Sequence, residues 1–599
     1  MTGYLVEDLD RLPGGDEATR RRYDTDRYQG ATGLNWYRAD PSLQRTLRRL
    51  LGAQGLAWAQ PHLERVGELM GTAIAERAEE TDRTPPRLER YDRWGRDVSR
   101  VVMPPSFEAS KADLLANSFA EPAFQEQARV AGANPSLLGH TWNYLLSQAE
   151  IGMFCALGTG GDMVLGLARQ FAPPDVAARV EEQLGGGMLS GETAQLFTER
   201  SGGSDLGALE TTAVRDGDAW RVDGYKWFAS NANGAAFVVL ARPEGAPEGV
   251  KGVAPFLVLW ERRDGTRNGV SIRRLKEKLG TQAVASAEVE LRGAEAFLLG
   301  PDPADAGSDA GDRTRSSSGA SAGGGMARMM AMTNGARLGI AVMGLGCARR
   351  ALVESLSYAA SREAFGAPLD RHPLMRRKLA ELIVEVEACQ QLVFDGFVSR
   401  LRLGAPLIKL RAARLGITAA SDAIEVHGGN GYIEQWPVAR LLRDAQVNTV
   451  WEGPDNILCL DVRRAMVKEA AHEALYERIR TALDASAEAD PAALEHVEGA
   501  LATLQKAVEH WWSLHEADAE AKLYPLAQLM IDVYAGALLC EQAAWEQRTL
   551  DSDRGSLVAR LYVRDHLVDR GPMRGIDQPA EELERFEDLR AGALVDDRR

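Results

Sequence analysis

The sequence predicts a mainly helical α+β fold in which a β domain is inserted between helical regions. Apolar residues recur at helical spacing from about residue 40 to residue 185. Between about 186 and 300 the spacing changes to the alternation typical of strands. From 326 onward helical spacing returns and continues through the C-terminal region. These changes of period divide the chain into a helical domain, a β domain and further helical domains.

Length, charge and cysteine content narrow the classes of protein to which the chain can belong. A chain of 599 residues is too long for one hydrophobic core, so several domains are expected. The formal net charge of −16 repels nucleic acid and anionic lipid on average. Five widely spaced cysteines without a C-x-x-C pair predict neither a metal site nor a disulfide framework, but thiols in a reducing cytoplasm.

No targeting or membrane segment is expected. The first ten residues have no basic start and no long apolar core, unlike a signal peptide. No apolar run approaches the roughly 20 residues of a membrane span. The longest candidate, 338–348, is short and rich in glycine, which favours a helix packed closely against another helix. We therefore expect a cytoplasmic protein without a membrane partner.

Residues 1–185 are predicted to form an N-terminal helical domain. Its first apolar stripes consist of Leu43, Leu47, Leu50, Leu51, Leu63, Val66, Leu69 and Met70. Residues 84–95 contain two prolines, a glycine and many charged side chains, so we expect a loop that crosses the surface. Helical spacing resumes through Leu145, Ile151, Met153 and Leu157.

Residues 186–300 are predicted to form the β domain. The pair Asp216-Gly217 is a good hairpin turn, and an alternating run follows it at 219–228. Further strands are expected at 237–240, 256–259 and 287–291.

The remaining chain contains one linker and two helical domains. Residues 301–325 consist only of Pro, Asp, Ala, Gly, Ser, Arg and Thr and cannot bury enough apolar surface to fold. A flexible linker is favoured there over a lid, because nothing in the segment could pack. Long helices are expected over 326–465, and an additional helical domain over 466–599.

Two runs around the β domain carry groups that suit a flat cofactor with a phosphate. In the first, 197–205, the Thr198 hydroxyl can bond a ring edge, the glycines allow close backbone approach, and Ser204 adds a phosphate donor. In the second, 224–231, Phe228 and Ser230 point to one face of a strand. The alternatives are an ordinary polar turn and an ordinary half-buried strand.

A third region combines a glycine turn with a single carboxylate. The turn is His427-Gly428-Gly429-Asn430-Gly431-Tyr432, where backbone can approach a ligand closely. Glu452 follows the apolar pair Val450-Trp451 and precedes a glycine. Apolar surroundings raise the pKa of a carboxyl group and suit it to act as a base. The alternative is a solvated glutamate in a helical region.

In this order, the runs resemble the acyl-CoA dehydrogenase family, whose pattern is T-E-x-x-x-G-S-D followed by G-x-K-x-W-I-T-N. Residues 358–366 resemble the family's Y-x-x-x-R-x-x-F-G, and the resemblance continues through the glycine turn, 440–444 and 451–453. It covers about residues 40–465. Residues 84–95 and 451–461 are similar to the AidB-type branch, which is associated with the alkylation-damage response and has an extra helical C-terminal domain.

The resemblance implies an N-terminal helical domain, a central β-barrel or sandwich, a four-helix bundle and the extra C-terminal helical domain. It implies FAD between the β domain and the bundle, with Glu452 removing an α-proton while a β-hydride moves to FAD. The implied FAD contacts are Phe197, Thr198, Gly203, Ser204, Phe228, Ala229, Ser230, Arg362, Phe365, Glu425, Gly428, Gly429 and Asn456. Ser204 and Arg337 would also contact the substrate.

The implied partners follow from the same resemblance. Arg362 and the turn from Glu425 to Gly429 would serve the cofactor of a neighbouring subunit, so a homotetramer is expected. The substrate would be an acyl-CoA or a related activated acid, and electron-transfer flavoprotein or another acceptor would reoxidise the protein.

The chain also departs from the family pattern. Glu425 stands where the family usually has Gln, a departure that agrees with the AidB branch. Pro454 replaces a Thr or Ser, which removes one hydroxyl contact to the flavin. The family's Gln near Pro373 is missing, and the 301–325 segment is longer than usual.

Two functions remain open: an FAD-dependent acyl-CoA dehydrogenase, or an AidB-like flavoprotein that binds DNA or a protein partner with little dehydrogenase activity. From 461 to 599 there are 17 Lys or Arg and 28 Asp or Glu. The best basic cluster consists of Arg560, Arg564, Arg570 and Arg574, with Asp565, Asp569 and Asp577 between them. DNA binding depends on basic clusters, so the enzyme is favoured.

Overall fold

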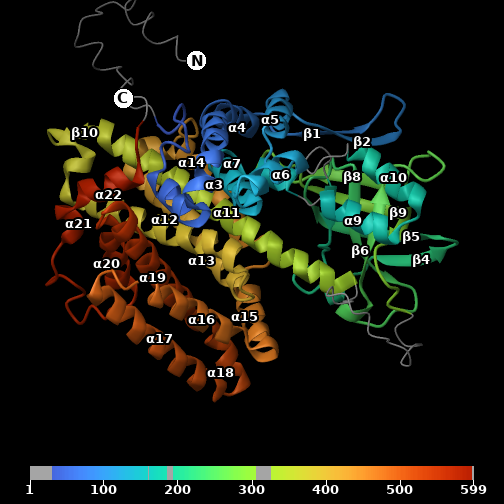
Figure 1. Cartoon of the computed structure of the whole chain (residues 1–599). Helices are drawn as coiled ribbons and strands as arrows, with labels where there is room; N and C mark the ends of the chain where they lie inside the picture. Colours follow the sequence, from blue (N-terminus) through green and yellow to red (C-terminus); the bar gives the residue numbers. More distant parts are fainter. Residues whose placement is uncertain (1–29, 159–160, 185–192, 305–324, 597–599) are drawn as a thin grey trace, which may run out of the picture.

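The computed structural model describes residues 30–158, 161–184, 193–304 and 325–596. Figure 1 shows a large helical body with the β domain at one end and the C-terminal helices along one side. One continuous cluster of buried apolar side chains joins the N-terminal helices, the central helices and the C-terminal helices, from Ala31 to Ala593. The β domain has a separate core.

The N-terminal helices begin at side-chain caps. The Asp40 carboxylate accepts the backbone N–H of Leu43 at 2.9 Å, and Pro41 fills the first helical position, where its missing N–H costs nothing. Asn134 caps the helix that begins at Pro135 in the same way. The described α-helices of this region are α3 (Pro41–Leu69), α4 (Ala75–Arg83), α5 (Pro105–Ala116), α6 (Pro122–Val130), α7 (Pro135–Ala149) and α8 (Ile151–Leu157).

The prediction of a surface loop at 84–95 is wrong. The structure has a hairpin there, formed by β1 (Arg87–Tyr91) and β2 (Asp97–Val102). Leu88 pairs with Val101, and both side chains pack against the core of the β domain. The Asp92 carboxylate accepts two backbone N–H groups of the turn. A short charged strand is stable here because Leu88 and Val101 are partly buried against another domain.

The central strands close into a barrel. In the ring, β6 pairs with β4 and β7, β5 joins β4 to β9, and β9 pairs with β7. The hairpin predicted at Asp216-Gly217 is confirmed, with Asp216 paired to Ala219. The strands are β3 (Thr193–Leu196), β4 (Thr212–Asp216), β5 (Ala219–Ala229), β6 (Ala236–Pro243), β7 (Ala254–Leu259), β8 (Val270–Leu275) and β9 (Ala287–Leu298).

Two helices that precede the barrel in sequence pack on it. These are α9 (Gly161–Phe171) and α10 (Pro174–Gln183), which Figure 1 shows beside the strands. Their buried Val164, Val176 and Val180 share a cluster with Val238 and Leu257 of the barrel. They therefore cover one face of the β domain and bury its apolar residues.

The helices after the barrel pack tightly around α11 (Gly325–Ser361). Their bounds are α12 (Pro373–Ser399), α13 (Gly404–His427), α14 (Pro437–Ala445) and α15 (Asp455–Glu469). A two-residue ribbon pair, β10 (Glu363–Ala364) and β11 (Ala367–Pro368), follows α11. The segment 305–324, which holds most of the expected linker, lies outside the described residues, as does the N-terminal segment 1–29.

The contact between α11 and α13 leaves no space for a side chain at Gly344. A Cβ there would lie 2.3 Å from the backbone oxygen of Ala412. Gly344→Ala is therefore expected to lower the free energy of unfolding by about 1–3 kcal/mol through overpacking. Gly335→Ala, on the same helix with nothing within 4 Å, is the control and should raise it by about 0.5–1 kcal/mol. Denaturant unfolding measures both, and equal effects would contradict the packing argument.

The C-terminal helices share the core of the preceding helices. Arg554 donates two bonds to the Glu387 carboxylate on α12, at 2.7 and 2.5 Å, and Arg49 on α3 donates to Gln542 at 2.6 Å. Both contacts join the extension to the main body. Its helices are α16 (Ala471–Asp484), α17 (Pro491–Trp512), α18 (Glu516–Ala521), α19 (Leu523–Leu550), α20 (Arg554–His566), α21 (Glu581–Glu584) and α22 (Phe586–Ala593).

One helix corrects the expectation that no segment is long and apolar enough for a membrane span. Within the described residues, α19 meets that test by length and composition. Its most apolar window is 72% buried inside the structure, against α12, α16, α17 and α20. Burial against other helices is the property of a core helix.

Candidate active site

Glu452 lies in a tight turn immediately before α15. Its backbone φ is +53°, and that of Gly453 is +99°, so two successive residues adopt the left-handed region. This conformation is uncommon for a residue with a side chain and persists where the surroundings hold it. Pro454 ends the turn, and its carbonyl accepts the N–H of Ile457 in the first turn of α15.

Two buried cations hold the backbone of this turn. Arg337 Nε on α11 donates to the carbonyl of Glu452 at 3.2 Å. Lys409 Nζ on α13 donates to the carbonyl of Gly453 at 2.7 Å. The Arg337 guanidinium also binds Asp461 at 2.5 Å and Asn334 at 3.1 Å, so it forms part of the protein framework.

The carboxyl group of Glu452 suits a base. Burial raises its pKa above the usual range, and the charges of Arg337 and Lys409 offset part of that effect. No hydrogen bond or ion pair to its carboxylate is found among the described residues. The carboxylate is therefore available to accept a proton.

Helix α8 lies near both Glu452 and the end of β5. The half-buried Cys155 of α8 lies close enough to feel the charges of Glu452 and Lys278, and burial raises its pKa to about 12. The next residue, Ala156, accepts a hydrogen bond of 3.2 Å from the Asn231 amide. Asn231, just after β5, therefore contacts the same short helix whose Cys155 feels the charge of Glu452.

The two predicted runs of the β domain also come together. The N–H of Trp227 donates to the carbonyl of Thr198 at 2.9 Å. A Cβ on Gly203 would lie 3.2 Å from Cγ2 of Thr198, so the loop folds back on its own start. Phe228 remains 48% exposed beside the buried Ala229, while Ser204 is exposed on the loop.

An ion pair beneath these runs was not predicted as a site feature. Lys226 Nζ donates to the Glu199 carboxylate at 2.5 Å and to the carbonyl of Leu240 at 2.6 Å, and both side chains are buried. Glu199 also accepts from the hydroxyl of Thr211 and the N–H of Glu210. Burial raises the pKa of Glu199, but Lys226 outweighs it and keeps that pKa low. Both residues lie in the runs identified from the sequence: Glu199 in the T-E pattern and Lys226 in the G-x-K pattern.

Two cations flank the aromatic pair on β5. Lys276 Nζ lies 3.2 Å from the centre of the Trp227 ring and 4.8 Å from that of Phe228. The guanidinium of Arg200 lies 4.3 Å from the Trp227 ring on the loop side. These contacts fix the indole and place positive charge beside Phe228.

The other predicted residues form a second group, at the end of α11 and α13. Arg362 is exposed, and Phe365 is 98% exposed. The glycine turn is held by Tyr358, whose ring stacks on His427 at 4.2 Å and whose hydroxyl accepts from Asn430 at 3.1 Å. Gly428 has a φ of +60°, and Glu425 accepts a hydrogen bond from Lys378. Gly429 is exposed at the glycine turn. Asn456 does not belong to this group, because it is exposed in the first turn of α15, next to the turn of Glu452.

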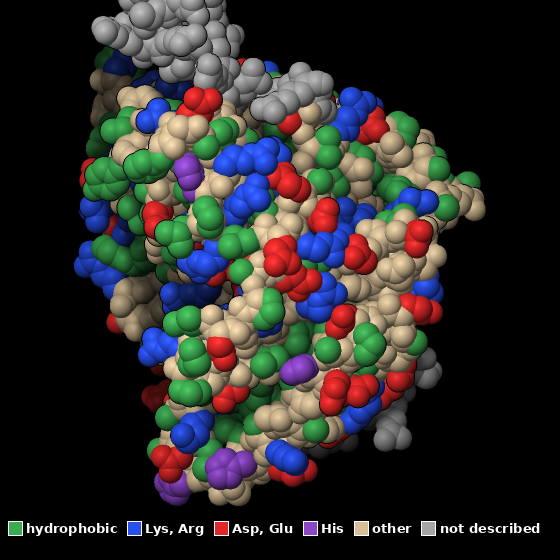
Figure 2. Space-filling model, turned by 90° about the vertical axis from the view of Figure 1, so that its left-hand side faces the viewer, with side chains coloured by type: hydrophobic (Ala, Val, Ile, Leu, Met, Phe, Trp, Pro, Cys, Tyr) green, Lys and Arg blue, Asp and Glu red, His purple; other side chains and the backbone are tan. Residues whose placement is uncertain are grey.

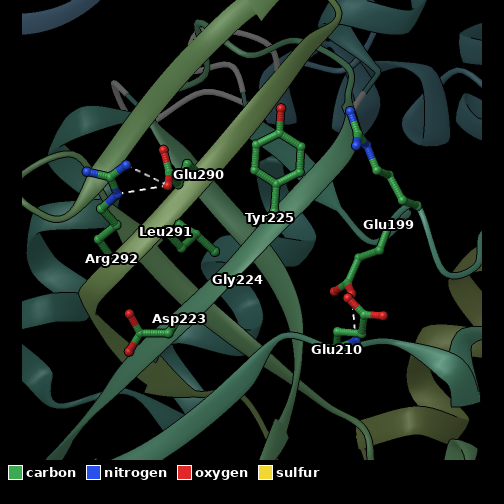
Figure 3. A pocket seen from close by; sticks show the side chains of 9 residues that line it. Glu199, Glu210, Asp223, Gly224, Tyr225, Glu290, Leu291 and Arg292 are labelled. Atoms are coloured by element: carbon green, nitrogen blue, oxygen red, sulfur yellow. Dashed lines mark hydrogen bonds and ion pairs between the residues drawn. The ribbon is translucent and has the colours of Figure 1, made fainter.

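A surface hollow of about 470 Å³ lies on the outer face of the barrel. Figure 3 shows Tyr225 projecting from β5, with Arg292 bound to Glu290 on one side and Glu199 beside Glu210 on the other. Four carboxylates and two guanidinium groups line it, a balance unsuited to a diphosphate. The loop of Thr198 to Ser204 and the glycine turn provide the groups that suit one.

Comparison with protein families matches three successive parts of the chain. Residues 28–181 match the adaptive response protein AidB N-terminal domain. Residues 194–294 match the acyl-CoA dehydrogenase middle domain, and residues 323–467 match the acyl-CoA dehydrogenase C-terminal domain. The matches follow the order of the helical region, the barrel and the bundle.

Curated relatives and solved structures extend the similarity over most of the chain. Acyl-CoA dehydrogenase family member 11 of Caenorhabditis elegans is 29% identical over 546 residues, 86% of this chain and 85% of the relative. AidB of Escherichia coli (strain K12) is 31% identical over 462 residues, 73% of this chain and 79% of the relative. The crystal structure of Caenorhabditis elegans ACDH-11 in complex with C11-CoA has a TM-score of 0.78 at 28% identity and covers 90% of this chain and 93% of that chain.

The order of domains, the barrel and the C-terminal extension thus agree with the predicted fold. Because a relative at 31% identity aligns with 73% of this chain and 79% of its own length, the relationship is not confined to one domain. The chain belongs to the acyl-CoA dehydrogenase family and carries an AidB N-terminal domain and a C-terminal helical extension.

Proposed function

We propose that the protein is an FAD-dependent acyl-CoA dehydrogenase that forms a C=C bond between the α and β carbons of an acyl-CoA. The observation that supports this most strongly is the turn at Glu452. It presents an unpaired carboxylate with a raised pKa beside α8, while α11 and α13 hold its backbone. Such a group suits removal of an α-proton.

The residues of the two groups fit FAD. The hydroxyls of Thr198 and Ser204 suit a ring edge and a phosphate, and the exposed Phe228 beside the buried Ala229 and the half-buried Ser230 suits a flat ring. Arg362 offers an exposed guanidinium fork for phosphate oxygens. The acyl-CoA dehydrogenase of Bacillus anthracis, solved in complex with FAD, shares this fold with a TM-score of 0.60 at 16% identity.

In this proposal FAD, when bound, would supply the redox chemistry that takes up the β-hydride. Glu452 takes the α-proton on its carboxylate, so it must be ionised when substrate binds. Arg337 and Lys409 fix the backbone from which that carboxylate extends. Ser204 lies on the exposed loop where substrate can reach it, whereas Arg337 would act on substrate only from within its buried network.

The exposed second group supports an oligomer. Phe365 is 98% exposed and Tyr432 is 85% exposed, and both lie at the end of the bundle with Arg362. Large apolar side chains at such exposure mark a surface that is covered in the working protein. We therefore propose that this surface completes the FAD site of a neighbouring subunit in a cytoplasmic homotetramer. Electron-transfer flavoprotein or another acceptor would reoxidise it.

The second candidate is an AidB-like DNA-binding flavoprotein, which the AidB N-terminal domain favours. The basic cluster of the extension does not support it. Arg560 pairs with Glu581, Arg564 with Glu582, and Arg570 with Asp565. On the face shown in Figure 2, basic and acidic side chains are interspersed. Guanidinium groups that are already paired contribute little counterion release on DNA.

Flavin content and reduction by substrate test the proposal. The purified protein should show flavin absorbance, and straight-chain acyl-CoAs of increasing length should bleach it under anaerobic conditions. The chain length that bleaches it fastest would identify the substrate class. A protein that cannot take up FAD would contradict both candidates. A flavoprotein that no acyl-CoA bleaches would contradict the enzyme, and salt-sensitive duplex binding would then favour the second candidate.

A further inference from the structure

Lys409 is a fully buried lysine at the turn of Glu452. Its relative exposure is 0%, and its Nζ lies 2.7 Å from the carbonyl oxygen of Gly453. Burying an ammonium group without a paired carboxylate is costly, so a neutral residue would be expected in its place if packing alone mattered. Among the described residues no carboxylate lies within ion-pair distance of Lys409.

Among the charged groups near Lys409, Glu452 makes no ion pair with another described residue. Four charged groups influence it: Asp455, Arg337, Glu452 and Arg414. Asp455 is bound by Arg414 at 2.6 Å, and Arg337 is bound by Asp461 at 2.5 Å. Asp461 is shared with Arg402, which binds it at 2.6 Å. Of the four groups, Glu452 is the one that makes no ion pair with another described residue.

We propose that Lys409 is a positioning residue for the base: its ammonium group ties the Gly453 carbonyl to α13, holds Glu452 in its left-handed turn, and stabilises the ionised carboxylate. Arg337 supplies the second anchor from α11, and its charge also lowers the pKa of Glu452 although the guanidinium is paired with Asp461. Lys409 differs from Arg337 in that no carboxylate lies within ion-pair distance of its ammonium group among the described residues. This inference rests on the proposed role of Glu452.

The conformation of the turn supports the same conclusion. Left-handed backbone at a glutamate is strained and needs external contacts to persist. The structure supplies two such contacts, to successive carbonyls, from α11 and α13. Loss of one should let the turn relax and move the carboxylate.

The pH profile of flavin reduction separates this role from a purely structural one. Lys409→Met keeps an apolar chain of similar length but removes the charge and the donor. The pH at which the reaction is lost on the acid side should rise by about one unit, because the carboxylate loses the favourable charge. The maximal rate should fall about tenfold as the turn relaxes. Lys409→Gln keeps a hydrogen-bond donor without the charge. It should shift the acid side of the pH profile (the acid limb) in the same direction, with a smaller loss of maximal rate.

The matched control is Arg414→Met. Arg414 lies on the same helix and binds Asp455 near the same turn, but it makes no contact with the backbone of Glu452 or Gly453. It should leave the acid limb in place. An unshifted acid limb in both Lys409 variants, or an equal shift in Arg414→Met, would overturn the inference.

A second readout needs neither FAD nor substrate. The difference infrared spectrum between the wild-type apoprotein and Glu452→Gln isolates the carboxyl band of Glu452, and its pH titration gives the pKa of that group. The same titration in the Lys409→Met background should give a pKa about one unit higher. If no acyl-CoA reduces the wild-type flavoprotein, the proposed function fails while this titration still decides the inference.

Discussion

Glu452→Gln is expected to lower the rate of flavin reduction by acyl-CoA by about 10³–10⁴-fold, with FAD still bound. The amide has nearly the same shape as the carboxylate but cannot accept the α-proton. The contacts that hold the turn come from Arg337 and Lys409 to backbone carbonyls, so the substitution leaves them unchanged. Anaerobic stopped-flow absorbance of the flavin measures the rate, and the flavin-to-protein absorbance ratio measures FAD content.

The control is Glu469→Gln, at the other end of α15, where the carboxylate pairs with Arg402 on the surface. It should leave the rate within about twofold, since exposed pairs contribute little. A loss of less than about tenfold in Glu452→Gln would assign the proton transfer to another group.

The pH dependence of the wild-type reaction has a defined direction. Burial raises the pKa of Glu452, so the base becomes protonated at a higher pH than an exposed glutamate. The rate of flavin reduction should therefore fall as pH decreases through that raised pKa. Glu452→Gln should lose this acid limb, and its residual rate should be flat over the same range.

Periodicity predicted the arrangement of the fold because long buried helices and barrel strands repeat their apolar residues over many positions. The barrel strands at 219–229 and 287–298 and the helix at 373–399 follow this pattern. The β1–β2 hairpin was missed because its burial depends on Leu88 and Val101 against a distant domain. Charged residues dominate its sequence, so nothing local distinguishes it from a loop.

The site was predictable to the extent that its residues lie in short motifs. Glu452, Thr198 and Phe228 belong to such motifs. In the structure the carbonyl of Thr198 accepts from Trp227 at the end of β5, and the charge of Glu452 reaches Cys155 of α8. Lys409 and Lys226 were missed because a lysine in sequence is normally a surface residue. Only the three-dimensional packing shows that both ammonium groups are buried and what they contact.

The sequence predicted the residues of the second group, but not how they relate to a neighbouring subunit. Arg362, Phe365 and the glycine turn cluster at the bundle end, on a surface that one chain leaves exposed. Their sequence motifs carry no information on which subunit they serve. The family relationship supplied that expectation, and the exposure of Phe365 is the physical observation that agrees with it.

Lys226→Met is expected to lower the free energy of unfolding by about 3–5 kcal/mol, because it leaves the buried Glu199 carboxylate without its cation. Glu199 adjoins Thr198, and Lys226 lies two residues before Phe228, so FAD content should fall as well. Arg221→Met is the control on the same strand. Its pair with Asp216 is 59% exposed on both sides and should be worth less than about 1 kcal/mol.

A double variant separates the charge from the packing. Adding Glu199→Gln to Lys226→Met removes the unpaired buried charge, while an amide oxygen can still accept from Thr211. The double variant should therefore be more stable than Lys226→Met alone, measured by denaturant unfolding. If the effects of the two substitutions on the free energy of unfolding instead add, the cost of Lys226→Met comes from lost packing and from the lost bond to Leu240. The ion pair would then not hold the two motifs together.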